Sequence, residues 1–411
     1  MVAYLTMRKF GIPRLAAMSS VTTLLEMKHY VRTVYGISKT YYGGEKWILE
    51  GNKPHGNGQG NGNGPALWAG ISSPLLNILR ELENDIQFSS PISNEELRLS
   101  AFGFVDDMDF VQTARDGDSN LDVFQKTKKG VRLWEELLRV TGGAIETSDT
   151  KTDRVNIDFE WKNEKWNMKP KDDQMVIHVR NHTGNEVEIK QLEPSTARET
   201  LGVMQSITGD EQPQVEKLLK KIKQWETNVM PNSLTPHETR IAMTSTIGRT
   251  LEYPLPATAM NADQCQQLNK AFKKCALPKS GIVRSAAEDL VYTPDHLLGL
   301  GLKDIETQQK IAHLKILLEH GAEDTVTGQL IRILCEGVLI ECGVRGDLFW
   351  IHPSFCTWVE DNWIWNTLKA LEDSEIEIIN SISHLKEWKK MIFSLWNKFP
   401  KKGSLTIGNY I

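Results

Sequence analysis

The pattern of apolar and polar residues changes between helical and strand-like spacing in the first half of the chain. Apolar residues recur every three or four positions in residues 67–82 and 121–140, which predicts two amphipathic helices. Between these segments, residues 99–105 alternate, and a second apolar run covers residues 108–111. Two adjacent aspartates separate the two runs. This order predicts two antiparallel strands whose short connection carries both carboxylates.

The same reasoning predicts the remaining elements. Residues 2–10 and 24–36 show helical spacing, and two further strand pairs are expected in residues 157–168 and 175–191. Beyond residue 205 the pattern is mostly helical, most clearly in residues 215–225, 311–320, 327–344 and 385–396. We therefore expect an α+β protein with one domain over residues 1–205 and a helical one over residues 206–411.

Composition and charge limit the classes of function. The 411 residues are 40% hydrophobic and 25% charged, which is ordinary for a globular protein. A net charge of −5 argues against tight binding of nucleic acid by overall charge alone. Basic clusters are present in residues 126–132, 217–223 and 386–402, and a solvated helix face is the simpler interpretation of each one.

The cysteines and the lengths of the apolar runs indicate in which cellular compartment the protein is expected. Five cysteines are present, an odd number without metal-ligand spacing, which is typical of reduced thiols in the cytoplasm or nucleus. The N-terminal residues lack the apolar core of a signal peptide. No uninterrupted apolar run reaches the length of a membrane span. We expect a cytoplasmic or nuclear protein without a membrane partner.

The two aspartates, Asp106 and Asp107, are the strongest candidates for chemistry. Adjacent carboxylates at a hairpin tip can supply one side of a site for two divalent cations, which hold the attacking and leaving oxygens of a phosphoryl transfer. Magnesium takes oxygen ligands but only one or two carboxylates for each ion, so a third acid from another strand normally completes such a site. A plain surface turn is the competing interpretation, because aspartate is a favoured turn residue.

A glycine-rich segment precedes the first of the two amphipathic helices. The sequence HGNGQGNGNGP spans residues 55–65, and its alternating glycines allow close approach of a ligand or another strand. A loop of this kind that opens a helix can bind phosphate groups. It is not a P-loop, because no Gly-Lys-Ser/Thr follows it, and it is not a dinucleotide-binding fingerprint. The alternative is a flexible Gly/Asn linker.

These segments, taken in order, resemble reverse transcriptases. GNGQGNGNGP, the helix with SSPLLN and then FVDD are similar to motifs B and C of that family, most of all those of non-LTR retroelements. TGGA at residues 141–144 followed by Lys151 resembles motif D, and LGV at residues 201–203 resembles the segment near the primer grip. The resemblance covers about residues 1–230.

The resemblance implies an RNA-directed DNA polymerase. Residues 1–205 would be a partial palm and residues 206–411 a helical thumb with a C-terminal extension. The activity would be two-metal nucleotidyl transfer with Mg²⁺ or Mn²⁺, and the partners would be an RNA template, a DNA primer and a dNTP. Asp106 would be the principal metal ligand and Asp107 its supporting neighbour.

The same resemblance implies roles for six further residues. Lys151 would donate a proton to the leaving pyrophosphate, and Phe104 would pack beside the active site. The residues that would line the nucleotide and the template are Gln59, Gly60, Asn61 and Gly62.

The chain departs from the family at motif A, whose aspartate is the third metal ligand. Residues 1–84 contain no aspartate, and their only acids are Glu26, Glu45, Glu50, Glu81 and Glu83. The segments 2–10 and 24–36 read as the palm helices that follow motif A, so the chain is expected to start after that motif. Two interpretations follow: a reverse transcriptase-like protein that is catalytically incomplete, or a non-catalytic retroelement remnant that binds nucleic acid weakly.

Overall fold

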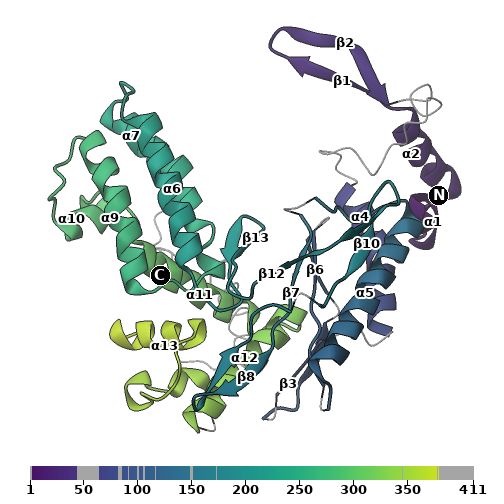
Figure 1. Ribbon diagram of the computed structural model, residues 1–411. Coiled ribbons are helices and arrows are strands. Elements are labelled where there is room, and N and C mark those ends of the chain that lie inside the picture. The colour runs from purple at the N-terminus through teal and green to yellow at the C-terminus, as the bar shows by residue number, and fades with distance from the viewer. Residues whose placement is uncertain are drawn as a thin grey trace. The chain divides into compact units, whose positions relative to one another are not determined.

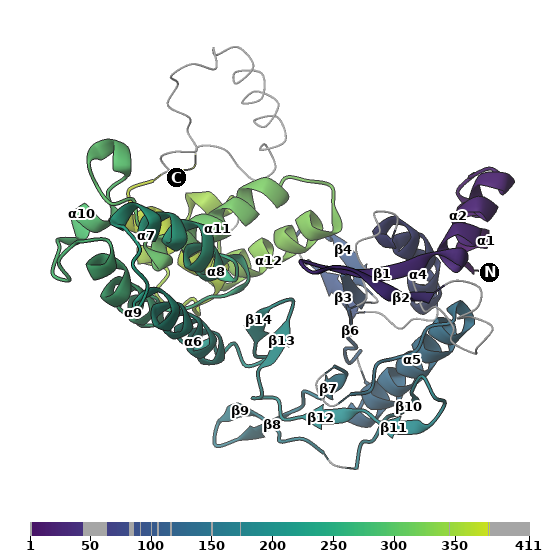
Figure 2. The same cartoon turned by 90° about the horizontal axis from the view of Figure 1, so that it is seen from above.

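The computed structural model shows a mixed α+β protein that divides into two compact units. It describes residues 2–43, 64–81, 86–90, 92–99, 101–104, 107–115, 117–148, 151–172, 174–344, 346–376 and 378. The first unit contains residues 1–87 and 98–193, and the second contains residues 88–97 and 194–411. In the described residues each sheet is two-stranded (Figures 1 and 2).

The first unit begins with helices and short hairpins in alternation. In chain order, its first eight elements are α1 (Val2–Lys9), α2 (Arg14–Glu26), β1 (Lys28–Thr33), β2 (Gly36–Gly43), α4 (Gly64–Glu81), β5 (Ala101–Phe104), β6 (Asp107–Phe110) and α5 (Asn120–Thr141). The hairpin of β3 (Ile86–Ser89) and β4 (Glu96–Leu99) lies at the division between the units. The predicted helices at residues 2–10, 67–82 and 121–140 are confirmed.

The prediction of a helix over residues 24–36 is wrong. α2 ends at Glu26, and the chain then forms the antiparallel pair β1–β2. The segment is rich in tyrosine and β-branched residues, which favour strands, and the turn uses Gly36 at φ 122°. The apolar positions that matched a helical period also fit this hairpin, and its turn signal decides between the two.

α5 is the central helix of the first unit and has both of its ends capped. Ser119 and Asp122 form a reciprocal capping box at its start, and Gly142 ends it in the left-handed conformation. Near its N-terminus, Phe124 packs with Ile177 and other apolar residues of the strand region. Its C-terminal half packs Trp134 and Leu138 against α4. One amphipathic helix therefore joins two small cores.

The rest of the first unit consists of short strands, named here in chain order: β7 (Asp153–Val155), β8 (Phe159–Lys162), β9 (Lys165–Met168), β10 (His178–Arg180), β11 (Glu186–Glu188) and β12 (Lys190–Leu192). The pairs β8–β9 and β10–β11 are antiparallel, which confirms both predicted hairpins. The parallel pair of β7 with β12 was not predicted.

The second unit is mainly helical, as predicted. Its longer segment, residues 194–411, begins with the hairpin of β13 (Arg198–Thr200) and β14 (Val203–Gln205). Its helices are α6 (Gln212–Val229), α7 (Pro236–Ala242), α8 (Gly248–Glu252), α9 (Ala262–Lys279), α10 (Glu288–Tyr292), α11 (Ile305–His320), α12 (Val326–Cys342) and α13 (Trp363–Asp373). α6 and α9 lie side by side (Figure 2) and share a core. The helix predicted for residues 385–396 lies outside the described residues.

Two hydrophobic cores stabilise the second unit. One is built around α6, α8 and α9, and the other around α11, α12 and α13. All five cysteines are buried and free. His313 is a core residue whose Nε2 lies 2.8 Å from the carbonyl oxygen of Thr258. Burial lowers the pKa of this histidine.

The tip of the β3–β4 hairpin binds to α12. Arg332 donates to both carboxylate oxygens of Glu95, from Nη2 at 2.6 Å and from Nε at 3.1 Å. One turn later, Glu336 accepts hydrogen bonds from the Ser90 hydroxyl and from the Ser93 backbone N–H. These contacts explain why residues 88–97 belong to the second unit although the flanking residues belong to the first.

Candidate functional site

The predicted acidic hairpin is present as the pair β5–β6. Its register is Ala101 with Phe110, and Phe104 with Asp107, so these last two residues close the ladder. The prediction of two antiparallel strands is confirmed, whereas the tip between them, residues 105–106, lies outside the described residues. Asp106 lies outside them, and Asp107 is described as the exposed first residue of β6.

The two faces of this hairpin differ in chemistry. Opposite residues of an antiparallel pair share a face, and residues two apart on a strand do so as well. One face therefore carries Phe102, Phe104, Asp107 and Asp109. Phe102 is 43% exposed and Phe104 is 61% exposed, and Asp107 is exposed too. Two aromatic rings and two carboxylates thus occupy the open face of a four-residue ladder.

The opposite face anchors the hairpin to the core of the first unit. Met108 and Phe110 pack against the cluster formed by α4 and α5. The Phe110 ring meets the Trp134 ring edge-on, with the centroids 5.3 Å apart. Leu79 on α4 is 1% exposed within the same cluster. Asp107 therefore lies on a strand pair whose opposite face packs against two long helices.

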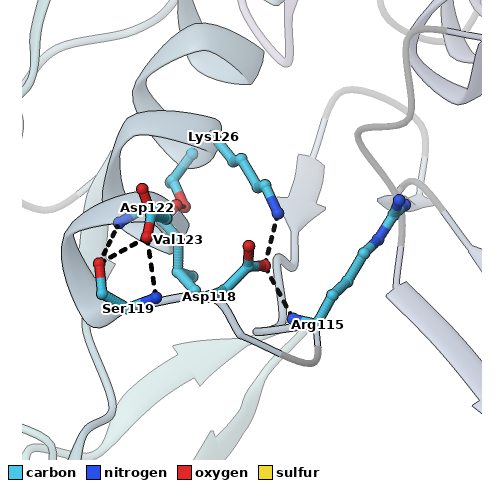
Figure 3. Close-up of polar contacts among 7 residues, drawn as sticks. Arg115, Asp118, Ser119, Asp122, Val123 and Lys126 are labelled. Carbon is cyan, nitrogen blue, oxygen red and sulfur yellow. Dashed lines mark hydrogen bonds and ion pairs between the residues drawn. The ribbon is translucent and has the colours of Figure 1, made fainter.

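Asp107 differs from the acids that follow it along the chain. Within the described residues, its carboxylate has no hydrogen bond or ion pair. Asp118 accepts from the Arg115 backbone N–H and pairs with Lys126, and the Lys126 hydrogen bond lowers the pKa of the Asp118 carboxyl (Figure 3).

Asp122 is committed to the helix cap in the same way. Its carboxylate accepts from the Ser119 hydroxyl at 2.6 Å and from the Ser119 backbone N–H at 2.8 Å (Figure 3). These bonds, the hydroxyl one first, lower the pKa of Asp122. Asp118 and Asp122 therefore serve the start of α5. In the part of the chain that the structure describes, no group of three His, Cys, Asp or Glu residues could hold a metal ion.

The other predicted site residues divide into two groups. Four of them, Gln59, Gly60, Asn61 and Gly62, lie outside the described residues, and α4 begins at Gly64, directly after their segment. Lys151 is described: it is exposed, and its backbone N–H donates to the Ser148 carbonyl at 2.9 Å just before β7.

A second candidate site lies within the second unit, at the turn between β13 and β14. A cleft of about 430 Å³ is lined by this turn, by Lys217 and Lys221 of α6, and by Arg249 and Tyr253. The Lys217 ammonium donates to the Gly202 carbonyl at 2.6 Å, and the Tyr253 hydroxyl donates to the Leu201 carbonyl at 2.7 Å. Two residues of the turn, Leu201 and Gly202, have positive φ angles.

This cleft combines cationic and aromatic side chains on one surface. Tyr253 is 63% exposed, and Lys217 also pairs with Glu199 at 2.9 Å. The segment at residues 201–203 and the lysines of α6 were noted in the sequence. Arg249 and Tyr253 were not, because their positions near the turn depend on contacts about fifty residues apart along the chain.

Comparisons with known proteins add no assignment. No protein-family model matches this sequence, and no curated protein matches it. None of the helices that the structure describes has the length and apolarity needed to cross a membrane.

Proposed function

We propose that this chain is a reverse transcriptase-like protein that carries the motif C half of a two-metal nucleotidyl-transfer site. The single observation behind the proposal is the β5–β6 hairpin. It presents Asp107 on an open aromatic and acidic face, and its other face packs on the helix that follows the glycine-rich segment. Aspartates at a hairpin tip are in the right place to bind cations that a nucleotide and a primer end also contact.

Mg²⁺ or Mn²⁺ would be held by the adjacent carboxylates Asp106 and Asp107. The donor set fits one side of such a site, since the Asp107 carboxylate has no partner among the described residues, and oxygen is the preferred ligand of both ions. When bound, such ions neutralise charge on the transferring phosphoryl group. Phe104 would contact the nucleotide or template from the same face.

The remaining roles follow the resemblance to reverse transcriptases. The segment with Gln59, Gly60, Asn61 and Gly62 would line the incoming nucleotide and template, next to the start of α4. Lys151 would serve as the proton donor to pyrophosphate. Residues 1–84 hold no aspartate that could act as a third carboxylate, so we propose that these 411 residues bind a template and primer but extend the primer poorly or not at all.

The alternative function is non-catalytic binding of nucleic acid. The cleft beside the β13–β14 turn favours it, because Lys217, Lys221, Arg249 and Tyr253 offer cations and a ring without any need for a metal. This function would survive loss of every carboxylate of the hairpin.

The test is primer extension on an RNA template with Mg²⁺ or Mn²⁺, together with Mn²⁺ binding measured by electron paramagnetic resonance. The proteins compared are the wild type, Asp106→Ala, Asp107→Ala and a matched control, Asp373→Ala, which removes an exposed acid at the end of α13. We expect weak Mn²⁺ binding in the wild type and in the control, and a loss of at least tenfold in both hairpin variants.

Each outcome separates the hypotheses. Extension that the two hairpin variants abolish would mean that another acid of this chain completes the site. Binding of template and primer without extension, with Mn²⁺ binding that depends on Asp106 and Asp107, is the result we expect. If the hairpin variants bind Mn²⁺ like the control and nothing extends, the hairpin is only a surface turn and the two-metal proposal fails.

A further inference from the structure

The β1–β2 hairpin has a composition unlike that of the chain as a whole. Residues 27–44 contain no acid and three cations, whereas the complete chain has a net charge of −5. The same stretch contains four of the eight tyrosines of the chain. A two-stranded ribbon without a hydrophobic core gains little stability from such rings, so their presence calls for another explanation.

The contacts place a cation and two rings on one face of the ribbon. Tyr30 and Tyr41 are directly opposite each other, with ring centroids 5.5 Å apart. The Lys28 ammonium lies 4.8 Å from the centre of the Tyr41 ring. Arg32 follows Tyr30 by two residues on β1, so strand alternation places it on the side of the tyrosine pair. Lys39 lies two residues before Tyr41, in the part of β2 where the register shifts between Tyr30 and Arg32, and it adds a third cation to the same hairpin.

The exposure of these side chains leaves them free to contact a ligand. Tyr30 is 49% exposed and Tyr41 is 40% exposed. At the turn, Val34 and Tyr35 are 95% and 98% exposed. An aromatic ring that is almost wholly in water gains nothing from the fold of this unit, whereas it would gain from a planar partner.

We propose that this hairpin is a binding arm for single-stranded nucleic acid. Lys28, Arg32 and Lys39 would contact successive phosphates, and bases would stack on Tyr30, Tyr41 and Tyr35. The charge of the arm is complementary to that of a phosphate backbone, because residues 27–44 contain cations and no acid. Aromatic rings interleaved with cations are also the groups by which proteins bind single strands without reading their sequence. The proposal rests on the proposed function only for the class of ligand, which is nucleic acid in both. Binding by this arm needs no metal and no catalysis.

A second hairpin of the same unit provides a matched control. In β8–β9, Trp161 and Trp166 are also opposite each other, with centroids 5.4 Å apart, and they are 61% and 66% exposed. The charges of that hairpin are balanced, since Glu160 and Glu164 accompany Lys162 and Lys165. It therefore presents an aromatic pair at a similar centroid distance without a net positive charge, and we expect it to bind no nucleic acid.

The experiment measures the affinity of the full chain for a labelled 20-nucleotide RNA, and for DNA of the same sequence, by fluorescence anisotropy at several salt concentrations. Removing the three cations (Lys28→Gln, Arg32→Gln and Lys39→Gln together) should lower the slope of log K against log salt by about 2, at roughly 0.7 for each lost phosphate contact. Replacing Tyr30 and Tyr41 with alanine should weaken binding about tenfold with little change in that slope.

The controls separate this proposal from failure of folding and from failure of the metal site. Tyr35→Ala changes a residue that is 98% exposed, so it cannot act through the core, and it should weaken binding severalfold. Trp161→Ala with Trp166→Ala should bind like the wild type, and affinity measured in EDTA should equal that measured with Mg²⁺, because the arm needs no metal. Unchanged affinity in the three arm variants, or an equal loss in the tryptophan variant, would overturn the proposal whatever the primer-extension assay shows.

Discussion

Glu135 of α5 is a buried carboxylate between two arginines, and its partners can be removed one at a time. The Glu135 side chain is 5% exposed. Its Oε1 accepts from Arg180 Nε at 2.6 Å and lies 3.4 Å from Arg139 Nη1. Arg180 and Arg139 are 44% and 38% exposed. The burial is therefore asymmetric: the acid is inside, whereas both arginines keep access to water.

This asymmetry predicts unequal costs for removing the two partners of one ion pair. Arg180→Met leaves a buried carboxylate with only the longer contact to Arg139, which should cost about 3 kcal/mol of unfolding free energy, the lower end of the range for orphaned buried charges. Glu135→Leu removes the buried charge itself and returns two arginines to water. Because an apolar side chain of similar volume replaces it, the change should cost about 1 kcal/mol or less.

Urea unfolding followed by tryptophan fluorescence measures both costs, because Trp134 lies next to Glu135 in the core of the first unit. Since the chain has two units, their transitions should be fitted separately if they do not coincide. The double variant should resemble Glu135→Leu, since the arginine has nothing left to neutralise. Equal costs for the two single variants, or a larger cost for Glu135→Leu, would refute the reasoning from asymmetric burial.

Two further predictions concern the second unit. Gly248→Ala would place a Cβ 2.9 Å from the Met243 carbonyl oxygen, which accepts the hydrogen bond of the Gly248 backbone N–H at the end of a π-helical turn. This variant should therefore lower the melting temperature of the second unit. Gly337→Ala in α12 is the control: its Cβ would meet nothing within 4 Å, and the change should raise the free energy of unfolding by about 0.5 kcal/mol. Burial lowers the pKa of His313, so below about pH 6.5 the unfolded chain binds a proton that the folded chain does not. The free energy of unfolding should therefore fall as the pH is lowered from 7 to 5. This fall should be less steep in His313→Gln than in the wild type.

Much of the local structure could be predicted from spacing, because it depends on neighbours along the chain. α4 and α5 follow from apolar periodicity, and the β5–β6 hairpin follows from alternation on both sides of the aspartates. The helix predicted for residues 24–36 is wrong because the apolar positions of this segment fit a helical and a strand period alike, and its β-branched residues and Gly36 favour the hairpin.

Contacts between distant segments could not be predicted in the same way. The parallel pairing of β7 with β12 joins strands about 37 residues apart, and nothing in either segment names its partner. The bond from Arg332 to Glu95 spans 237 residues and assigns a loop from the first half of the chain to the helical unit. A single sequence holds no signal for such a pairing of ordinary charged residues.

In the candidate site, too, the sequence gives the residue types, whereas the partners of each residue depend on the folded structure. The aspartates of residues 106–122 look alike in the sequence, yet Asp118 and Asp122 are bound by Lys126, by backbone N–H groups and by a capping hydroxyl. Asp107 has no such partner among the described residues and lies on the face opposite the core contacts of the hairpin. A carboxylate already satisfied by its own chain gains little from a cation, whereas one left to solvent at the end of a rigid ladder can exchange water for metal at small cost. The lack of a partner for Asp107 among the described residues, rather than the Asp-Asp spacing alone, makes the β5–β6 hairpin the place to test for metal binding.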